Sequence, residues 1–256
     1  MTLVIALACK DGIVMASDGQ ATGMSSGGPI RQKCEKIFEL HKGILLGASG
    51  TVGIIQRCRD AIREFAKEIV ENGLNFILKE ETSEGKFQEI TIRDKIRQII
   101  FSINKFEKER HKEFYGREEG YPVADILIAF FDPKDEKFKI WHVAHDGGEE
   151  LLNEFGYGCS GIGDTFAYAF LKNFYSKDMD IGIGKLVAYR VLKEAIEIGA
   201  YGLGEPITIW IIEKDKTYKL TEEELRGLED TVETWRKLEK EIFDNKKFVG
   251  EENETN

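Results

Sequence analysis

A continuous apolar run at the start of the chain limits the folds available to it. Residues 3–9 are all apolar, Asp11-Gly12 follows as a tight hairpin turn, and residues 13–17 return as a second strand. A strand with one face in water would alternate apolar with polar residues, so this pattern predicts strands that are covered on both faces. The sequence therefore predicts a hairpin buried between two other layers.

The rest of the chain alternates pairs of strands with pairs of helices. The predicted strand pairs are 36–40 with 43–48, 124–131 with 138–142, and 207–212 with 217–220. Apolar residues at three- and four-residue steps predict helices over 51–72, 90–107, 164–174 and 183–198. Residues 19–29 and the glycine-rich segment 156–163 are predicted as irregular, and 74–89 as a helical fragment with a loop. Hairpin-linked strands favour antiparallel sheets, so we predict an α+β fold: a four-layer αββα sandwich.

The predicted domain organisation is simple. Residues 1–220 form the sandwich, since no repeat or low-complexity linker divides them. A charged helix begins after Thr221, a residue suited to an N-terminal cap, and forms a helical appendage over 221–248. Residues 249–256 are predicted to be disordered.

Charge and cysteine usage exclude several classes of protein. The 46 acidic and 36 basic residues give a net charge of −10, which argues against nucleic acid or an anionic membrane as a partner. No apolar run approaches the roughly 20 residues of a membrane span. The four cysteines are scattered and no signal peptide precedes them, so we expect a cytoplasmic protein with reduced thiols.

Thr2 is a candidate nucleophile. Its side chain is small enough for Met1 to be removed, which would leave a hydroxyl and a free α-amine on one residue. An α-amine titrates at about 7.7–8.0, close to the pH at which a general base works. A threonine activated by its own amine is one of the known forms of hydroxyl nucleophile.

Three sequence blocks carry a family resemblance. They are Thr2 with Lys10-Asp11-Gly12 and Ala16-Ser17-Asp18, then Lys36-Ile37-Phe38, then residues 47–53 with the sequence Gly-Ala-Ser-Gly-Thr-Val-Gly. In order and spacing they resemble the β-subunits of the proteasome, which are N-terminal-nucleophile hydrolases. The resemblance covers the first third of the chain well, and beyond that it depends on the order of elements and on Gly161-Ile162-Gly163.

The resemblance implies a role for seven residues. Thr2 would be the nucleophile, Lys36 the cation beside it, Asp18 the partner of Lys36, and the N–H of Gly50 an oxyanion donor. Ala21, Thr22 and Ala48 would line the substrate site, where an extended peptide adds as a strand. The small side chains of Ala21 and Ala48 predict a roomy, weakly selective pocket. The resemblance also implies a homo-oligomeric ring or barrel of subunits, with no cofactor and no metal.

Three positions depart from the family pattern. The family's active subunits have a serine at the place of Ile162, and an acid and a second serine near Ala200 and Leu203. Ser160, Tyr201 and Glu205 are the candidates to replace these groups.

Four other readings compete with a peptidase. A non-catalytic scaffold subunit would keep Met1, and a peptide ligase of the connectase group would use Thr2 but pass the acyl group to an amine. Gly156, Gly158 and Gly161 fit a dinucleotide-binding pattern, which requires a parallel βαβ unit. In the fourth reading, His142 and His145, with Asp146 adjacent, offer metal ligands. A metal site requires a third ligand and a clear geometry, so ordinary polar roles are favoured.

Overall fold

The computed structural model describes residues 2–25, 28–81, 85–117, 120, 123–199 and 202–244. The chain divides into two compact units, residues 1–219 and 220–256, and each is described by itself. The assignment of domains at residue 220 stays a prediction. The predicted disordered tail, 249–256, lies outside the described residues.

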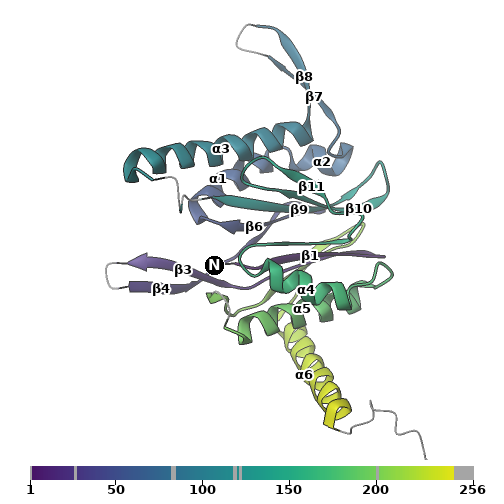
Figure 1. Ribbon diagram of the computed structural model, residues 1–256. Helices are drawn as coiled ribbons and strands as arrows, with labels where there is room; N and C mark the ends of the chain where they lie inside the picture. The colour runs from purple at the N-terminus through teal and green to yellow at the C-terminus, as the bar shows by residue number, and fades with distance from the viewer. Residues whose placement is uncertain are drawn as a thin grey trace, which may run out of the picture. The chain divides into compact units, whose positions relative to one another are not determined.

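Two five-stranded antiparallel sheets form the centre of the first unit (Figure 1). The first sheet has the order β12-β1-β2-β13-β14, with bounds Tyr157–Ser160, Val4–Cys9, Gly12–Ser17, Thr208–Ile212 and Thr217–Lys219. The second has the order β11-β10-β9-β6-β5, with bounds Glu149–Leu151, Lys137–Val143, Ala124–Asp132, Ile44–Gly50 and Ile37–His41. The predicted first hairpin is confirmed, with Val4 opposite Ser17 and Cys9 opposite Gly12.

Helices cover the outer face of each sheet. In Figure 1, α1, α2 and α3 lie on the side of the second sheet, and α4 and α5 lie on the side of the first. Their bounds are Val52–Arg63, Ala66–Asn72, Ile92–Tyr115, Asp164–Phe174 and Ile181–Glu197. The order of layers is helix, sheet, sheet, helix, which confirms the predicted αββα sandwich.

Separate apolar cores hold the layers together. Val4, Ile13 and Met15 of the first sheet pack against Leu45 and Leu127 of the second. The other face of the second sheet packs against α1, α2 and α3 through a larger cluster with many isoleucines. Strands β6 and β9 contribute residues to both cores and so need apolar residues on both faces, which explains their nearly unbroken apolar runs.

Several sequence predictions of local structure were wrong. The predicted loop at 19–29 contains β3 (Gln20–Ser25) and the start of β4 (Gly28–Lys33), and the segment 74–89 contains β7 (Ile77–Glu81) and most of β8 (Phe87–Thr91). Each pair forms its own two-stranded sheet outside the main sheets, so no buried face imposes an apolar pattern on it. The helix predicted at 51–72 is interrupted between α1 and α2, and α3 runs eight residues past its predicted end.

The second unit contains one helix, α6 (Glu222–Asp244). The predicted cap is present, because the Glu224 N–H donates to Thr221 Oγ1 at 3.2 Å and the Thr221 N–H donates to Glu224 Oε2 at 2.8 Å. This reciprocal pair satisfies two backbone donors at the helix start.

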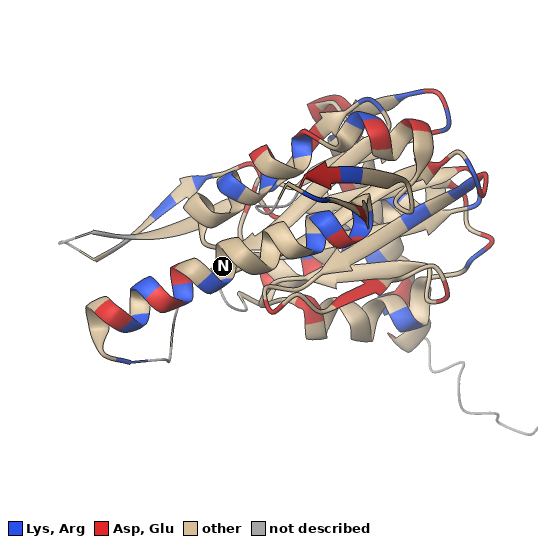
Figure 2. Ribbon diagram, turned by 90° about the horizontal axis from the view of Figure 1, so that it is seen from above, with Lys and Arg blue, Asp and Glu red and all other residues tan. Residues whose placement is uncertain are grey.

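Acidic and basic residues are interspersed along the helices that Figure 2 shows. None of the described helices is long and apolar enough to cross a membrane.

Candidate active site

The first hairpin fixes the position of Thr2. Thr2 directly precedes Leu3 and β1, and only 8% of its surface is exposed. The Leu3 N–H donates to Asp18 Oδ1 at 2.9 Å, and the Asp18 N–H donates to the Leu3 carbonyl at 3.2 Å. The backbone beside Thr2 is therefore held by the residue that ends the hairpin.

Asp18 and Lys36 form a buried ion pair. Lys36 Nζ lies 2.6 Å from Asp18 Oδ1, and the two residues are 5% and 0% exposed. The second carboxylate oxygen accepts N–H groups from Gln20 and Gly204, each at 3.3 Å. Buried charges need such partners. The hairpin pattern alone did not fix the side to which Asp18 points, and the structure directs it at Lys36.

Burial changes the proton affinity of Lys36. Loss of solvent lowers the pKa of its ammonium, and the charge and hydrogen bond of Asp18 oppose that shift. A lysine with a lowered pKa exchanges its proton more readily near neutral pH. Lys36 is thus suited both to stabilise a nearby negative charge and to assist proton transfer.

Gly50 ends β6 at the start of α1. Its φ is +118°, and a Cβ at this position would come within 2.0 Å of the Val123 carbonyl oxygen, so only glycine fits. The side chain of Thr51, the N-cap of α1, makes no capping hydrogen bond, and the first turn has no acidic residue. The positive end of the helix dipole is therefore not neutralised locally and favours negative charge there.

One cavity of about 360 Å³ brings the predicted site residues together. Its lining includes Thr2, Ala21, Thr22, Lys36, Ala48 and Gly50. Asp18, the seventh predicted residue, is not among the lining residues, but its carboxylate accepts a hydrogen bond from Lys36, which lines the cavity. Seven residues drawn from four separate stretches of sequence thus meet at one place.

The side walls of this cavity come from residues that the sequence did not point to. Val52, Ile55, Gln56 and Arg59 line it from α1, together with Phe38 of β5. The four helix positions are spaced three and four residues apart, beside the buried face formed by Ile54, Cys58 and Ile62. This spacing was a usable signal, because a second face on a helix that follows Gly50 must point near the site.

One position that departs from the family pattern, Ile162, directly follows a residue that lies close to Thr2. A Cβ added to Gly161, whose φ is +107°, would come within 2.2 Å of the Thr2 carbonyl oxygen, so the glycine permits this close approach. Buried Ser160 shares a 2.8 Å hydrogen bond with Ser49, and Ile162 is 49% exposed. The carboxylate of Glu205 contacts Lys193 and the N–H of Ile207. Tyr201 and Ala200 lie outside the described residues.

The dinucleotide-binding interpretation does not fit the fold. The segment with Gly156, Gly158 and Gly161 contains β12, which pairs antiparallel with β1. A dinucleotide site of that type requires a parallel βαβ crossover instead. His145, one of the residues weighed as a metal ligand, hydrogen-bonds Asp125 at 3.0 Å. No group of three or more potential metal ligands occurs among the residues that the structure describes.

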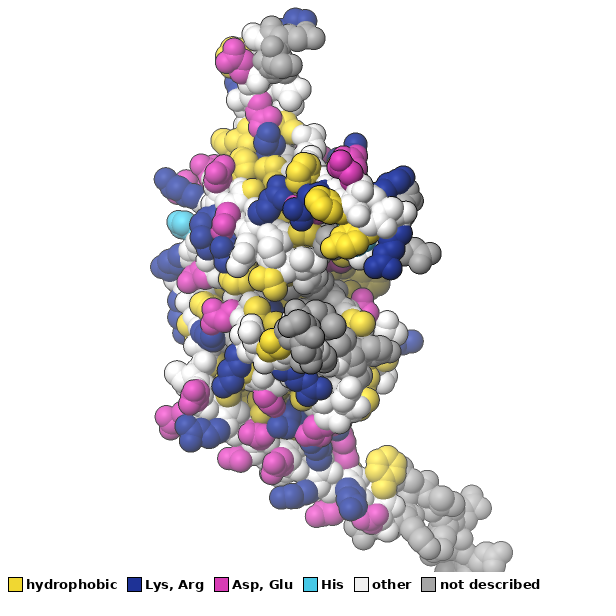
Figure 3. Space-filling model, turned by 90° about the vertical axis from the view of Figure 1, so that its left-hand side faces the viewer, with side chains coloured by type: hydrophobic (Ala, Val, Ile, Leu, Met, Phe, Trp, Pro, Cys, Tyr) yellow, Lys and Arg dark blue, Asp and Glu magenta, His cyan; other side chains and the backbone are white. Residues whose placement is uncertain are grey.

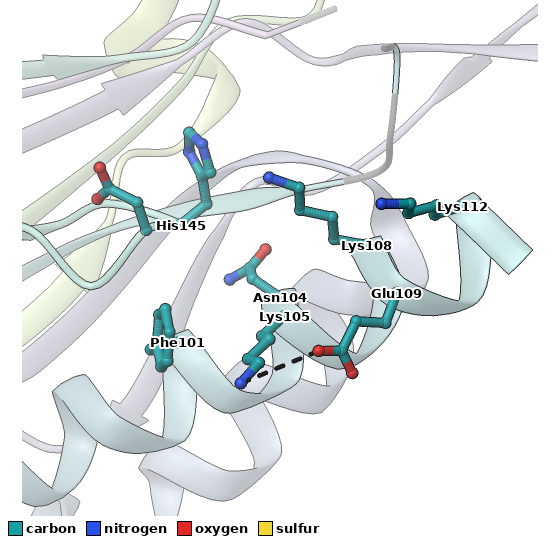
Figure 4. Close-up of a pocket in the computed structure, with 8 residues that line it drawn as sticks. Phe101, Asn104, Lys105, Lys108, Glu109, Lys112 and His145 are labelled. Carbon is teal, nitrogen blue, oxygen red and sulfur yellow. Dashed lines mark ion pairs between the residues drawn. The ribbon is translucent and has the colours of Figure 1, made fainter. Parts of the chain in front are cut away.

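Asn104 of α3 supports the strand that pairs with Gly50. Strand β10 covers β9 only from Ile126 onward, so Ala124 has no strand neighbour on that edge. Asn104 takes the place of that neighbour: its Oδ1 accepts the Ala124 N–H at 2.8 Å and its Nδ2 donates to the Ala124 carbonyl at 3.2 Å. On the other edge Ala124 lies opposite Gly50. Figure 4 shows Asn104 in a second cavity of about 360 Å³, between α3 and the turn that carries His145.

We expect Asn104→Ala to destabilise the protein by about 1–3 kcal/mol, because it leaves a buried backbone N–H and carbonyl without partners. Urea unfolding measures this loss. Asn173→Ala is the matched control, since the Asn173 side chain is exposed and makes only a 3.4 Å bond within α4. Equal midpoints for the two variants would show that Asn104 does not support the strand.

The fold and the site together define a class. An αββα sandwich with a threonine before its first strand, a buried lysine–aspartate pair and a glycine at a helix start has the architecture of the N-terminal-nucleophile hydrolases. Comparison with known proteins narrows this class. The family described as proteasome subunit matches residues 2–79 and 81–212, and the chain belongs to that family.

Individual relatives agree with this assignment. The chain is 27% identical over 227 residues to proteasome subunit beta of Methanococcus maripaludis, which covers 88% of this chain and 90% of the relative. It is 27% identical over 231 residues to proteasome subunit beta 2 of Nitrosopumilus maritimus, with 89% and 93% covered. Proteasome subunit beta 1 of Thermococcus sibiricus is 25% identical over 228 residues, with 89% and 94% covered.

Proposed function

We propose that this protein is a threonine-type hydrolase of peptide bonds, with Thr2 as the nucleophile once Met1 has been removed. The observation that carries the proposal is the buried Asp18–Lys36 pair on the cavity that Thr2 lines. Burying a lysine and an aspartate is costly for a fold, and apolar residues of similar volume would often be as stable. A buried lysine–aspartate pair beside Thr2 is therefore better explained by a role in catalysis than by a role in stability.

The proposed reaction uses groups that the site already contains. The α-amine of Thr2 takes the proton of the hydroxyl, whose oxygen attacks the substrate carbonyl. The ammonium of Lys36 stabilises the developing negative charge on Thr2, and the N–H of Gly50 stabilises the oxyanion; loss of one such donor typically costs about 2.7–4 kcal/mol. The protonated amine then passes its proton to the leaving amine, and water hydrolyses the resulting ester.

The cavity favours an extended peptide, and its lining combines apolar residues with the charged residues Lys33, Glu35 and Arg59. Ala21 and Thr22 belong to β3, which among the described strands pairs with β4 alone, so its other edge can accept an added strand. Thr22 Oγ1 is shielded from solvent and has no hydrogen-bond partner among the described residues. Phe38 and Ile55 supply apolar walls, and the guanidinium of Arg59 lies over the Phe38 ring at 5.1 Å.

A specific observation supports ligation as the second candidate reaction. Ile162 places an apolar, half-exposed side chain where the family's active subunits have a serine. An apolar group does not position water, so the acyl-enzyme would survive longer and an incoming amine would compete better. In this form the same Thr2 ester is resolved by aminolysis, as in the connectase group.

Intact-mass analysis and product analysis test the proposal together. We expect the purified protein to lack Met1, and to convert a peptide library to free-acid fragments, or to joined peptides when an amino-terminal peptide acceptor is added. A protein that keeps Met1 and yields neither product would instead be a non-catalytic scaffold subunit.

We also propose that the chain assembles into a homo-oligomeric ring or barrel, as its membership of the proteasome subunit family suggests. Sedimentation velocity should show a species several times heavier than the 29.1 kDa chain. A single monomeric boundary at all concentrations would contradict assembly of the chain on its own.

A further inference from the structure

The end of α3 carries exposed aromatic residues beside the candidate active site. Phe114 and Tyr115 lie in the last turn of the helix and are 79% and 67% exposed. The ring of His111 lies 4.7 Å from that of Tyr115, centroid to centroid, and the ring of Phe114 lies 6.5 Å from that of Tyr115. We call these three residues the α3 platform. Adjacent exposed aromatic rings on a protein surface commonly mark an interaction site.

The α3 platform lines a cavity that adjoins the catalytic one. This cavity, of about 730 Å³, is bounded by the platform and by Thr51 and Val123. Thr51 lies between Gly50 and Val52, which both line the cavity of Thr2. A chain passing the proposed oxyanion donor therefore reaches the α3 platform next. In Figure 1 the C-terminal end of α3 extends past the N-terminus on the side where the β3–β4 hairpin also projects.

The charged residues of this cavity favour an acidic ligand. Glu107 is buried and binds two guanidinium groups, Arg57 at 2.5 Å and Arg110 at 2.7 Å, so its negative charge is more than compensated. Arg117 adds another positive charge to the lining. Figure 3 shows hydrophobic side chains next to Lys and Arg side chains on the face to which the end of α3 points.

One polar atom of the platform is not satisfied within the described part of the chain. The Nε2 atom of His111 is shielded from solvent and has no hydrogen-bond partner there. Shielded polar atoms in native structures usually have a partner, so an exception calls for an explanation such as a ligand. A backbone or side-chain group of a bound peptide, running between Thr51 and the platform, would supply it.

From these features we infer that the α3 platform is a second binding site for protein substrates. It binds an extended, acidic segment with aromatic side chains, on the far side of Gly50 from the Ala48 pocket. Rings stack on Phe114 and Tyr115, and carboxylates face Arg110 and Arg117. The identity of the segment as substrate rests on the proposed function, whereas its binding does not need Thr2 as a nucleophile.

Fluorescence anisotropy tests the inference in the full-length Thr2→Ala protein, so that the outcome does not depend on catalysis. The probe is a fluorescein-labelled peptide, (Glu-Phe-Glu-Gly)3. We expect the double variant Phe114→Ser/Tyr115→Ser to bind it at least about tenfold more weakly, because aromatic residues dominate such contacts. Phe87→Ser is the matched control: Phe87 is 74% exposed on β8 and does not line this cavity, so its loss should leave the Kd unchanged.

Two further peptides separate the aromatic from the charged contribution. (Gln-Phe-Gln-Gly)3 should bind more weakly than the acidic peptide. Added salt should reduce the difference between the two Kd values, because it screens the charges. (Glu-Gly-Glu-Gly)3 should lose most of the affinity. The inference is overturned if the probe does not bind up to millimolar concentration, if the double variant binds as tightly as its parent, or if Phe87→Ser weakens binding equally. Failure of peptide cleavage with intact binding would instead count against the proposed function alone.

Discussion

Replacing Thr2 with alanine is expected to lower peptide turnover by a factor on the order of 10⁴ or more, because removing the nucleophile of a hydrolase leaves only binding and oxyanion stabilisation. The variant should fold normally. Thr2 lines the cavity, and its hydroxyl makes no hydrogen bond to the described residues, so the substitution leaves no hydrogen-bond partner unsatisfied among them. Steady-state hydrolysis and thermal unfolding measure the two effects separately.

Thr2→Ser is the matched control for this experiment. It keeps a hydroxyl and an α-amine in the same place, and a small side chain that still permits removal of Met1. We expect it to retain measurable turnover, whereas Thr2→Ala does not. Turnover by Thr2→Ala close to that of the unaltered protein would exclude Thr2 as the nucleophile.

The second large effect is expected at the buried ion pair. Asp18→Asn should destabilise the protein by about 3–5 kcal/mol, because it leaves the ammonium of Lys36 buried without its counter-charge. The same substitution weakens the acceptor for the Leu3 N–H, so turnover should fall with stability. Urea unfolding at pH 7 gives the first quantity. A loss below 1 kcal/mol would mean that water reaches Lys36 and that the pair is not sequestered.

The pH dependence of unfolding gives an independent check on Lys36. Its folded pKa is lowered, so between that pKa and the unfolded value the folded state binds fewer protons, and stability rises with pH. Below the folded pKa both states are protonated, and the full destabilisation by the buried charge is present. Removing Asp18 removes the group that raises the pKa, so in Asp18→Asn the rise in stability should begin at lower pH. Parallel pH profiles of the two proteins would contradict this.

Lys36→Met separates stability from chemistry. It removes the buried cation and leaves Asp18 with three backbone N–H donors, from Leu3, Gln20 and Gly204. We therefore expect a smaller loss of stability than in Asp18→Asn but a larger loss of turnover. Urea unfolding and peptide hydrolysis are measured on both variants. If one variant loses more of both stability and turnover than the other, the prediction is contradicted.

The strands and helices of the sandwich were predictable from the sequence because both faces of each sheet are buried. The short apolar runs at residues 3–9 and 126–131 favour strands covered on both faces, and α4 begins and ends where the spacing predicts. The hairpins β3–β4 and β7–β8 were missed for the opposite reason. Each forms its own two-stranded sheet outside the two main sheets. Its strands are held by backbone pairing and, in their described residues, have no face fully buried in a core, so the sequence shows no regular alternation of apolar and polar residues there.

Two of the predicted site residues stand where a strand ends. Asp18 ends the first hairpin and Gly50 ends β6, so the topology brings them to one end of the sandwich. The pairing of Asp18 with Lys36 came from the family resemblance. Asn104 and the α3 platform were not predictable, because their roles depend on where α3 crosses β9 and on how far it continues.

The most direct test of the account is to identify the atom that a peptidyl vinyl sulfone modifies. We expect one adduct per chain, on a peptide that begins with Thr2, seen by intact mass and then by fragmentation. Cys34 lines the same cavity and is the competing nucleophile, so the experiment is repeated in Cys34→Ala. An adduct on Thr2 in both proteins supports the account, whereas an adduct confined to Cys34, or one on a chain that keeps Met1, contradicts it.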